Sequence, residues 1–149
     1  MTDEEKKLVL ACGTFCHVTT QENADIGGLD PSSDMSVVIR GPKRPQAVYL
    51  CPESSLDKAL NVIGDRARGE KALIVFKVAA AVLAVKSCGP DFGWLSAHIG
   101  GAELEAATVK TSLDTVGAIA CYDLISPGEI SETVTVPNPK FDPEAGKLI

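Results

Sequence analysis

Cysteine and histidine are the residue types in this 149-residue sequence best suited to metal binding or nucleophilic chemistry. Cys12 and Cys16, followed by His17, form a C-x-x-x-C-H segment. On a strand these thiols would share a face about 13 Å apart, too far for one metal unless the chain turns between them. Cys51 precedes a proline and Cys88 precedes Gly-Pro, and cysteines on such loops can ligate an iron–sulfur cluster. Cys12, Cys16, Cys51 and Cys88 are therefore the candidate metal ligands.

The alternative interpretation is that these cysteines are small buried hydrophobic residues, in which case no cofactor is expected. The sequence has no C-x-x-C pair, and its odd number of cysteines is typical of reduced thiols in the cytoplasm. Cys121 lies inside the apolar segment AIACYDLI, residues 118–125, and is predicted to be a core residue.

Two other places could bind a small anion. A histidine and two glycines precede a predicted helix, and a helix N-terminus attracts anions. A predicted hairpin tip carries three basic residues. Both features also occur as ordinary turns in solvent. The candidate ligand-binding residues are His98, Gly100, Gly101, Arg40, Lys43 and Arg44.

Catalysis has little support in the sequence. His17 neighbours Cys16, but adjacent residues on a strand point to opposite faces. GxGxxG, P-loop, GxSxG and HExxH motifs are absent. No catalytic residue is therefore assigned, and a non-catalytic protein is favoured.

Composition limits the partners and the location. The net charge of −6 leaves no excess of basic residues for nucleic acid or anionic membranes. The charged N-terminus is followed by a five-residue apolar run, too short for a signal peptide, and the longest apolar stretch is too short to span a bilayer. We expect a cytoplasmic protein.

Hydrophobic patterning predicts the elements that would position these residues. The clearest is an amphipathic helix over 54–68, in which Leu56, Ala59, Leu60 and Ile63 form one stripe. Residues 71–88 fit a short strand running into a helix that ends at Gly89-Pro90, or else one long buried helix. The other predicted elements are a strand over 8–20, a loop over 21–34, a hairpin of strands 35–40 and 46–51, a strand over 94–99, a helix over 102–117, and strands over 118–125 and 130–136.

These elements predict an α/β protein, more exactly an α+β sandwich in which two to three helices pack on a mixed or antiparallel sheet. Residues 56–76 and 104–125 both read helix, glycine, strand, so the sheet is expected to contain pseudo-repeated helix–strand units. Residues 1–136 are predicted to form a single domain. Residues 137–149 are predicted to be an extended, proline-rich tail that lies on its own domain or on a neighbouring copy.

Part of the chain resembles the shell proteins of bacterial microcompartments. The resemblance covers residues 47–125 and rests on Trp94, the His98-Ile99-Gly100-Gly101 turn, the helix over 102–117 and the strand over 118–125. It implies two helices on a four-stranded sheet, with hexamers or trimers in which that turn is placed like a pore. A subgroup of the family with an iron–sulfur cluster at the pore would accommodate the cysteines.

Two functions remain open at this point. The favoured one is a non-catalytic, homo-oligomeric assembly or shell-type structural protein. The alternative is a small-molecule-binding protein or enzyme that uses the Cys/His loops, with an iron–sulfur cluster as its cofactor.

Overall fold

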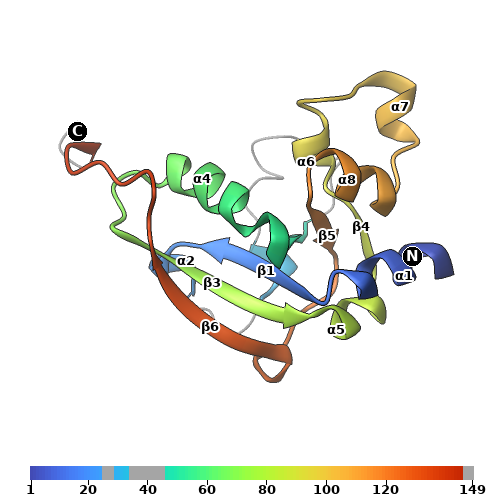
Figure 1. Ribbon diagram of the computed structural model, residues 1–149, viewed down its shortest axis with the longest axis horizontal. Coiled ribbons are helices and arrows are strands. Elements are labelled where there is room, and N and C mark those ends of the chain that lie inside the picture. Colours follow the sequence, from blue (N-terminus) through green and yellow to red (C-terminus); the bar gives the residue numbers. More distant parts are fainter. Residues whose placement is uncertain (25–28, 34–45, 146–149) are drawn as a thin grey trace.

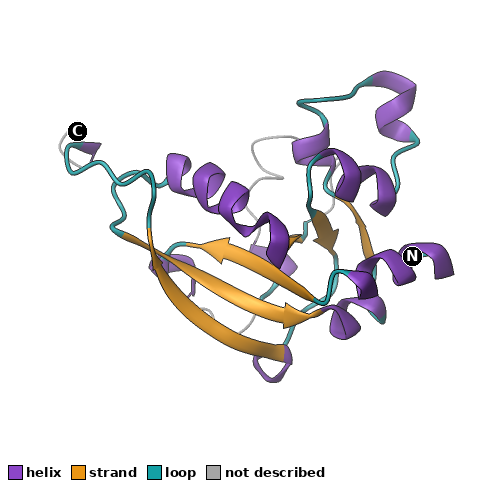
Figure 2. Cartoon of the chain, in the orientation of Figure 1, coloured by secondary structure: helices purple, strands orange, loops and turns teal. Residues whose placement is uncertain are grey.

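The computed structural model describes residues 1–24, 29–33 and 46–145. It has an α+β fold built on a six-stranded antiparallel sheet with strand order β4-β5-β2-β1-β3-β6 (Figures 1 and 2). The strands are β1 (Thr14–Thr19), β2 (Val48–Pro52), β3 (Ala72–Ala79), β4 (Cys88–Pro90), β5 (Ile119–Cys121) and β6 (Ile130–Pro137). The predicted α+β class and antiparallel sheet are confirmed.

Seven α-helices lie in the described ranges, more than the two to three expected. They are α1 (Asp3–Ala11), α2 (Gln21–Ala24), α4 (Leu56–Arg66), α5 (Ala80–Ala84), α6 (Phe92–Leu95), α7 (Gly101–Glu105) and α8 (Val109–Thr115). Short 3₁₀ turns cover Pro31–Ser33, Glu53–Ser55 and Pro127–Glu129. Four of the helices have only four or five residues, too few to show an apolar stripe. Among the described residues, no helix is long and apolar enough to cross a membrane.

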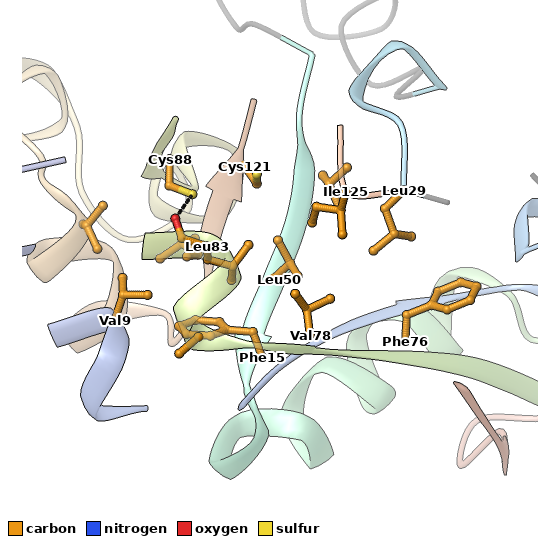
Figure 3. Close-up of a cluster of buried hydrophobic side chains, with 14 of the residues drawn as sticks. Val9, Phe15, Leu29, Leu50, Phe76, Val78, Leu83, Cys88, Cys121 and Ile125 are labelled. Atoms are coloured by element: carbon orange, nitrogen blue, oxygen red, sulfur yellow. Dashed lines mark hydrogen bonds between the residues drawn. The ribbon is translucent and has the colours of Figure 1, made fainter. Parts of the chain in front are cut away.

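The strand β3 lies between β1 and the edge strand β6 and is buried on both faces. Leu73 and Val75 pack with the apolar residues of α4, whereas Ile74, Phe76 and Val78 belong to the larger cluster on the opposite face. Figure 3 shows this larger cluster, with Phe76 and Val78 labelled. Successive side chains of a strand alternate between faces, so a strand covered on both sides is an unbroken apolar run. Of the two alternatives predicted for residues 71–88, the strand that runs directly into a helix is confirmed, since α5 follows β3 without a break.

The helix α4 confirms the strongest periodic prediction. Its apolar stripe packs on one face of the sheet against Cys16, Val18 and Cys51 (Figure 1). A 3₁₀ turn precedes the helix, and Ser55 at its N-cap makes no side-chain capping hydrogen bond.

At the N-terminus the structure differs from the sequence-based prediction. Residues 8–11, predicted as the beginning of a strand, are the last turns of the helix α1. Thr2 and Glu5 form a capping box, which satisfies backbone N–H groups at both positions and starts the helix. Gly13, with φ of 75°, then turns the chain into β1.

The segment after β3 contains three corrections. Cys88-Gly89-Pro90 does not end a helix, because α5 ends at Ala84 and these residues form β4. Residues 94–99 are not a strand: Asp91 caps the helix α6 through Trp94 N–H. The predicted helix over 102–117 is two helices, since Thr108 caps a new helix, α8. Its predicted end at Gly117, with φ of 65°, is confirmed.

The C-terminal half of the chain is closer to expectation. β5 is shorter than the predicted strand 118–125, although Ile125 makes an isolated bridge to Leu29. Cys121 is fully buried, as predicted. β6 pairs with β3 along its length and forms the sheet edge. The first residues of the tail lie on their own domain, because Asn138 N–H donates to Lys71 O and Asp142 N–H donates to Arg68 O.

The predicted hairpin depends on residues outside the described ranges. Its second strand, 46–51, corresponds to β2, whereas strand 35–40 and the basic tip cannot be placed.

Candidate functional site

The site begins where β1 and β2 diverge. These strands pair only at Phe15–Pro52 and Cys16–Cys51, whereas β1 pairs with β3 along its whole length. On its other side β2 pairs with β5 from Val48 to Leu50. Beyond Cys16, therefore, the two halves of the sheet separate.

His17 bridges this fork. Its Nδ1 atom lies 2.7 Å from the backbone oxygen of Tyr49. A carbonyl oxygen can only accept a hydrogen bond, so Nδ1 carries the proton and, in the neutral ring, Nε2 is the acceptor. The contact fixes the ring orientation and the tautomer of a half-buried histidine at the fork.

A cavity of about 760 Å³ opens at the fork, between the sheet, α4 and α6. This volume is within the range of small-molecule sites, and its wall is predominantly apolar, as such sites usually are. The strands contribute Cys16, His17, Val18, Tyr49, Leu50 and Cys51; α4 contributes Ala59, Val62, Ile63 and Arg66; the segment around α6 contributes Asp91, Gly93, Trp94, Ser96 and Ala97; and Ala118 precedes β5.

The two cysteines of the cavity wall are neutral thiols. Burial raises the pKa of Cys16 to about 11 and that of Cys51 to about 12. The thiolate is the nucleophilic form, and it is disfavoured in both residues at neutral pH. Cys16 and Cys51 therefore act as apolar wall, and the site lacks an activated cysteine nucleophile.

Asp91 is a buried acid in the cavity wall that positions α6. Its Oδ1 accepts a hydrogen bond from Trp94 N–H at 3.0 Å, and its own N–H donates to Ser112 Oγ at 2.9 Å. Ser112 Oγ in turn donates to Ala118 O at 2.5 Å. This chain of bonds ties α6 to α8 and to the start of β5, so the α6 side of the cavity is preorganised.

Two aromatic rings, Trp94 and Tyr49, and the cation Arg66 complete the cavity wall. Lys58 Nζ lies 5.0 Å from the centroid of the Trp94 ring, a cation–π contact that holds the indole beside the cavity. Tyr49 adds a second, half-buried ring. Arg66, in the last turn of α4, lines the cavity and is exposed to solvent.

The predicted anion-binding residues lie elsewhere. His98 is exposed in the loop after α6, Gly100 is the N-cap of the five-residue helix α7, and Gly101 is the first residue of that helix. None of the three lines the cavity. Arg40, Lys43 and Arg44 fall outside the described residues, so their role stays a prediction.

The predicted metal-binding cysteines are divided between different places. Cys16 and Cys51 face each other across β1 and β2, Cys88 faces Cys121 across β4 and β5, and Cys12 is the C-cap of α1. Within the described ranges, no three His, Cys, Asp or Glu side chains form a group that could hold a metal ion. An iron–sulfur cluster stays an untested prediction.

Four polar or aromatic residues of the cavity wall were not among the site residues predicted from the sequence. Tyr49, Arg66, Asp91 and Trp94 belong to no short motif, because they converge from β2, α4 and α6. One signal pointed there: Trp94 is the only tryptophan in the sequence, and Asp91 three residues before it is a typical N-cap.

The resemblance to microcompartment shell proteins has no independent support. Residues 94–99, which carry part of it, contain the end of a helix rather than a strand. No protein-family model matches this sequence, and no curated protein is detectably similar to it.

Proposed function

We propose that this protein binds a small, planar organic anion in the cavity between α4, α6 and the β1–β2 fork. One observation carries the proposal: a 760 Å³ cavity with a mostly apolar wall has aromatic rings at Tyr49 and Trp94 and the exposed cation Arg66. A few polar groups converging on an apolar pocket are the usual composition of a ligand site.

Different residues of the cavity wall favour different parts of the ligand. The indole of Trp94 and the ring of Tyr49 favour a flat aromatic group. The guanidinium of Arg66 favours a carboxylate, sulfonate or phosphate, with which it can make two parallel hydrogen bonds. His17 is a polar group in the same wall, and its ring, fixed by the bond to Tyr49 O, would orient the ligand.

Anilinonaphthalene sulfonate is a suitable probe, since it combines fused rings with a sulfonate. We expect its emission to rise on binding and Trp94 emission to fall through energy transfer, because Trp94 is the only tryptophan. Ala97→Phe places a ring into the cavity from an exposed lining position and should weaken binding at least tenfold. Ala106→Phe, at an exposed position outside the cavity, is the matched control. Equal binding by both variants would contradict the proposal.

A homo-oligomeric assembly protein stays the second proposal. What supports it is a set of exposed apolar side chains, of which Val85 is 84% and Leu124 54% exposed. Such side chains are often covered in oligomers. Light scattering of the purified protein tests this directly, and a monomer at high concentration would exclude it.

A further inference from the structure

Two pairs of cysteines face each other across neighbouring strands. Cys16 is opposite Cys51 on β1 and β2, and Cys88 is opposite Cys121 on β4 and β5. All four are buried free thiols. Antiparallel strands alternate hydrogen-bonded and non-hydrogen-bonded pairs, and facing side chains are closer in the second kind. The kind of pair therefore decides which two sulfurs can bond.

A proline identifies the kind of the Cys88–Cys121 pair. Pro90, two residues along β4, faces Ile119. Proline has no N–H, so these two residues cannot exchange both hydrogen bonds and must be a non-hydrogen-bonded pair. Because the kinds alternate, Cys88–Cys121 is also a non-hydrogen-bonded pair.

The neighbouring pair gives the same answer. Tyr122 N–H donates to Ser87 O at 2.8 Å, which makes Ser87–Tyr122 the hydrogen-bonded position beside the cysteines. Cys88 and Cys121 consequently have Cβ atoms about 4.5 Å apart, at the upper limit of the separation that a disulfide requires. Figure 3 shows the two residues side by side on adjacent strands.

The same reasoning excludes the other pair. Pro52 faces Phe15, so Phe15–Pro52 is non-hydrogen-bonded and the next pair, Cys16–Cys51, is hydrogen-bonded. Its Cβ atoms are about 5.5 Å apart, and a disulfide would require the strands to move. The two cysteine pairs therefore differ: Cys88 and Cys121 are close enough for a disulfide, whereas Cys16 and Cys51 are not.

We propose that Cys88 and Cys121 are a site of thiol oxidation, at which hydrogen peroxide converts the two thiols into a cross-strand disulfide. The Cys121 thiolate attacks a peroxide oxygen, the O–O bond breaks, and hydroxide leaves and takes up a proton as water. Cys88 then loses its proton and attacks the sulfenic sulfur of Cys121, and a second water leaves. Two thiols and one peroxide give one disulfide and two waters.

The surroundings favour this order of events. The Cys88 thiol donates to Leu83 O and the Cys121 thiol donates to Asp123 O, each at 3.5 Å, which holds both sulfurs in place. The neighbouring Cys88 thiol lowers the pKa of Cys121, while the neighbouring Cys121 and burial raise the pKa of Cys88. Cys88 lies on β4, one of the two edge strands of the sheet, and is 9% exposed, whereas Cys121 on β5 is fully buried. A small neutral oxidant therefore has to reach the Cys121 sulfur past Cys88.

The disulfide would close a loop over residues 89–120, which contains α6, α7 and α8. Closing a loop of this length restricts the unfolded chain, and we expect the melting temperature to rise by about 5–10 °C. The bond would also fasten the edge strand β4 to β5.

The test is a peptide map of the full chain after treatment with hydrogen peroxide, with remaining thiols blocked before digestion. Trypsin cuts after Lys86, Lys110 and Lys140, so Cys88 and Cys121 lie on peptides 87–110 and 111–140. We expect these two peptides to be joined, two of the five cysteines to escape labelling, and dithiothreitol to reverse both effects. A link between the peptides of Cys16 and Cys51 in equal yield, or five labelled cysteines, would overturn the proposal.

A pair of matched variants tests the stabilisation. Cys88→Ala should abolish the peroxide-dependent rise in melting temperature, whereas Cys51→Ala should retain it. If Cys88→Ala does not fold, the wild-type map still decides between the two pairs. An equal rise in both variants would show that another reaction stabilises the protein.

Discussion

Asn138, at the start of the C-terminal tail, lies against Gly64 in the helix α4. Its side-chain Nδ2 donates to Ala67 O and Glu70 O, each at 2.9 Å, where the helix ends. A Cβ at Gly64 would lie only 2.2 Å from Asn138 Oδ1. Gly64 therefore leaves room for the Asn138 amide, which caps the C-terminal end of α4.

The first prediction is that the effect of Gly64→Ala on the free energy of unfolding changes sign when Asn138 is replaced by alanine. Gly64→Ala should lower the free energy of unfolding by about 1–3 kcal/mol, because the methyl group displaces the buried amide from its carbonyl partners. In an Asn138→Ala background the clash is absent, and Gly64→Ala should instead stabilise the helix by up to about 1 kcal/mol. Urea denaturation measures all four proteins. Additive effects would mean that the amide moves aside without cost.

The second prediction concerns Glu5, whose carboxylate contacts the starts of two helices. Oε1 accepts Thr2 N–H and Oε2 accepts Val109 N–H, each at 2.9 Å. Glu5→Gln should cost about 1 kcal/mol in unfolding free energy, whereas Glu4→Gln, an exposed neighbour, should cost little.

The same contact predicts a pH dependence. The hydrogen bond from Thr2 N–H holds the pKa of Glu5 below its ordinary value of 4.5. A lowered folded-state pKa stabilises the protein above the unfolded value, and this contribution disappears as the pH falls through the folded value. Below pH 4.5 the stability difference between wild type and Glu5→Gln should therefore shrink. A difference that is constant down to pH 2 would contradict this.

The third prediction concerns alkaline pH. The pKa values of about 11 for Cys16 and about 12 for Cys51 are above the ordinary thiol value of 9.0. Between pH 9 and 11 the unfolded chain loses these protons and the folded chain keeps them, so stability falls as the pH rises. The slope should approach about 1 kcal/mol per pH unit for each thiol. Cys51→Ala should reduce it, and an unchanged slope would show that these thiols titrate normally.

The fourth prediction concerns the proposed ligand site. Arg66→Gln should weaken binding of anilinonaphthalene sulfonate about five- to twentyfold, because it removes the cation of the cavity wall. Arg68→Gln is the matched control, since Arg68 is outside the cavity and pairs with Asp65. Fluorescence titration at low and high salt measures both. If the two variants bind equally, Arg66 does not contact the anion.

The sequence by itself determined the elements whose pattern is local. The apolar stripe of Leu56, Leu60 and Ile63 predicted α4, because burial of one face imposes a period on neighbouring residues. The apolar run from Leu73 to Phe76 indicated a buried element but left a strand and a long helix as alternatives, and the structure shows the strand β3. The helix α1 has a local signal too, the capping box of Thr2 and Glu5, but the prediction of a strand from residue 8 missed this helix.

Only the tertiary structure decided the sites. The cavity exists because β1 leaves β2 after two pairs, and this divergence is invisible in either strand alone. The same holds for the cysteines: their spacing suggested four metal ligands, but strand register places them as two separate facing pairs. Pairing joins residues far apart in the chain, and a shift of one residue would move each side chain to the other face. No local pattern contains that information.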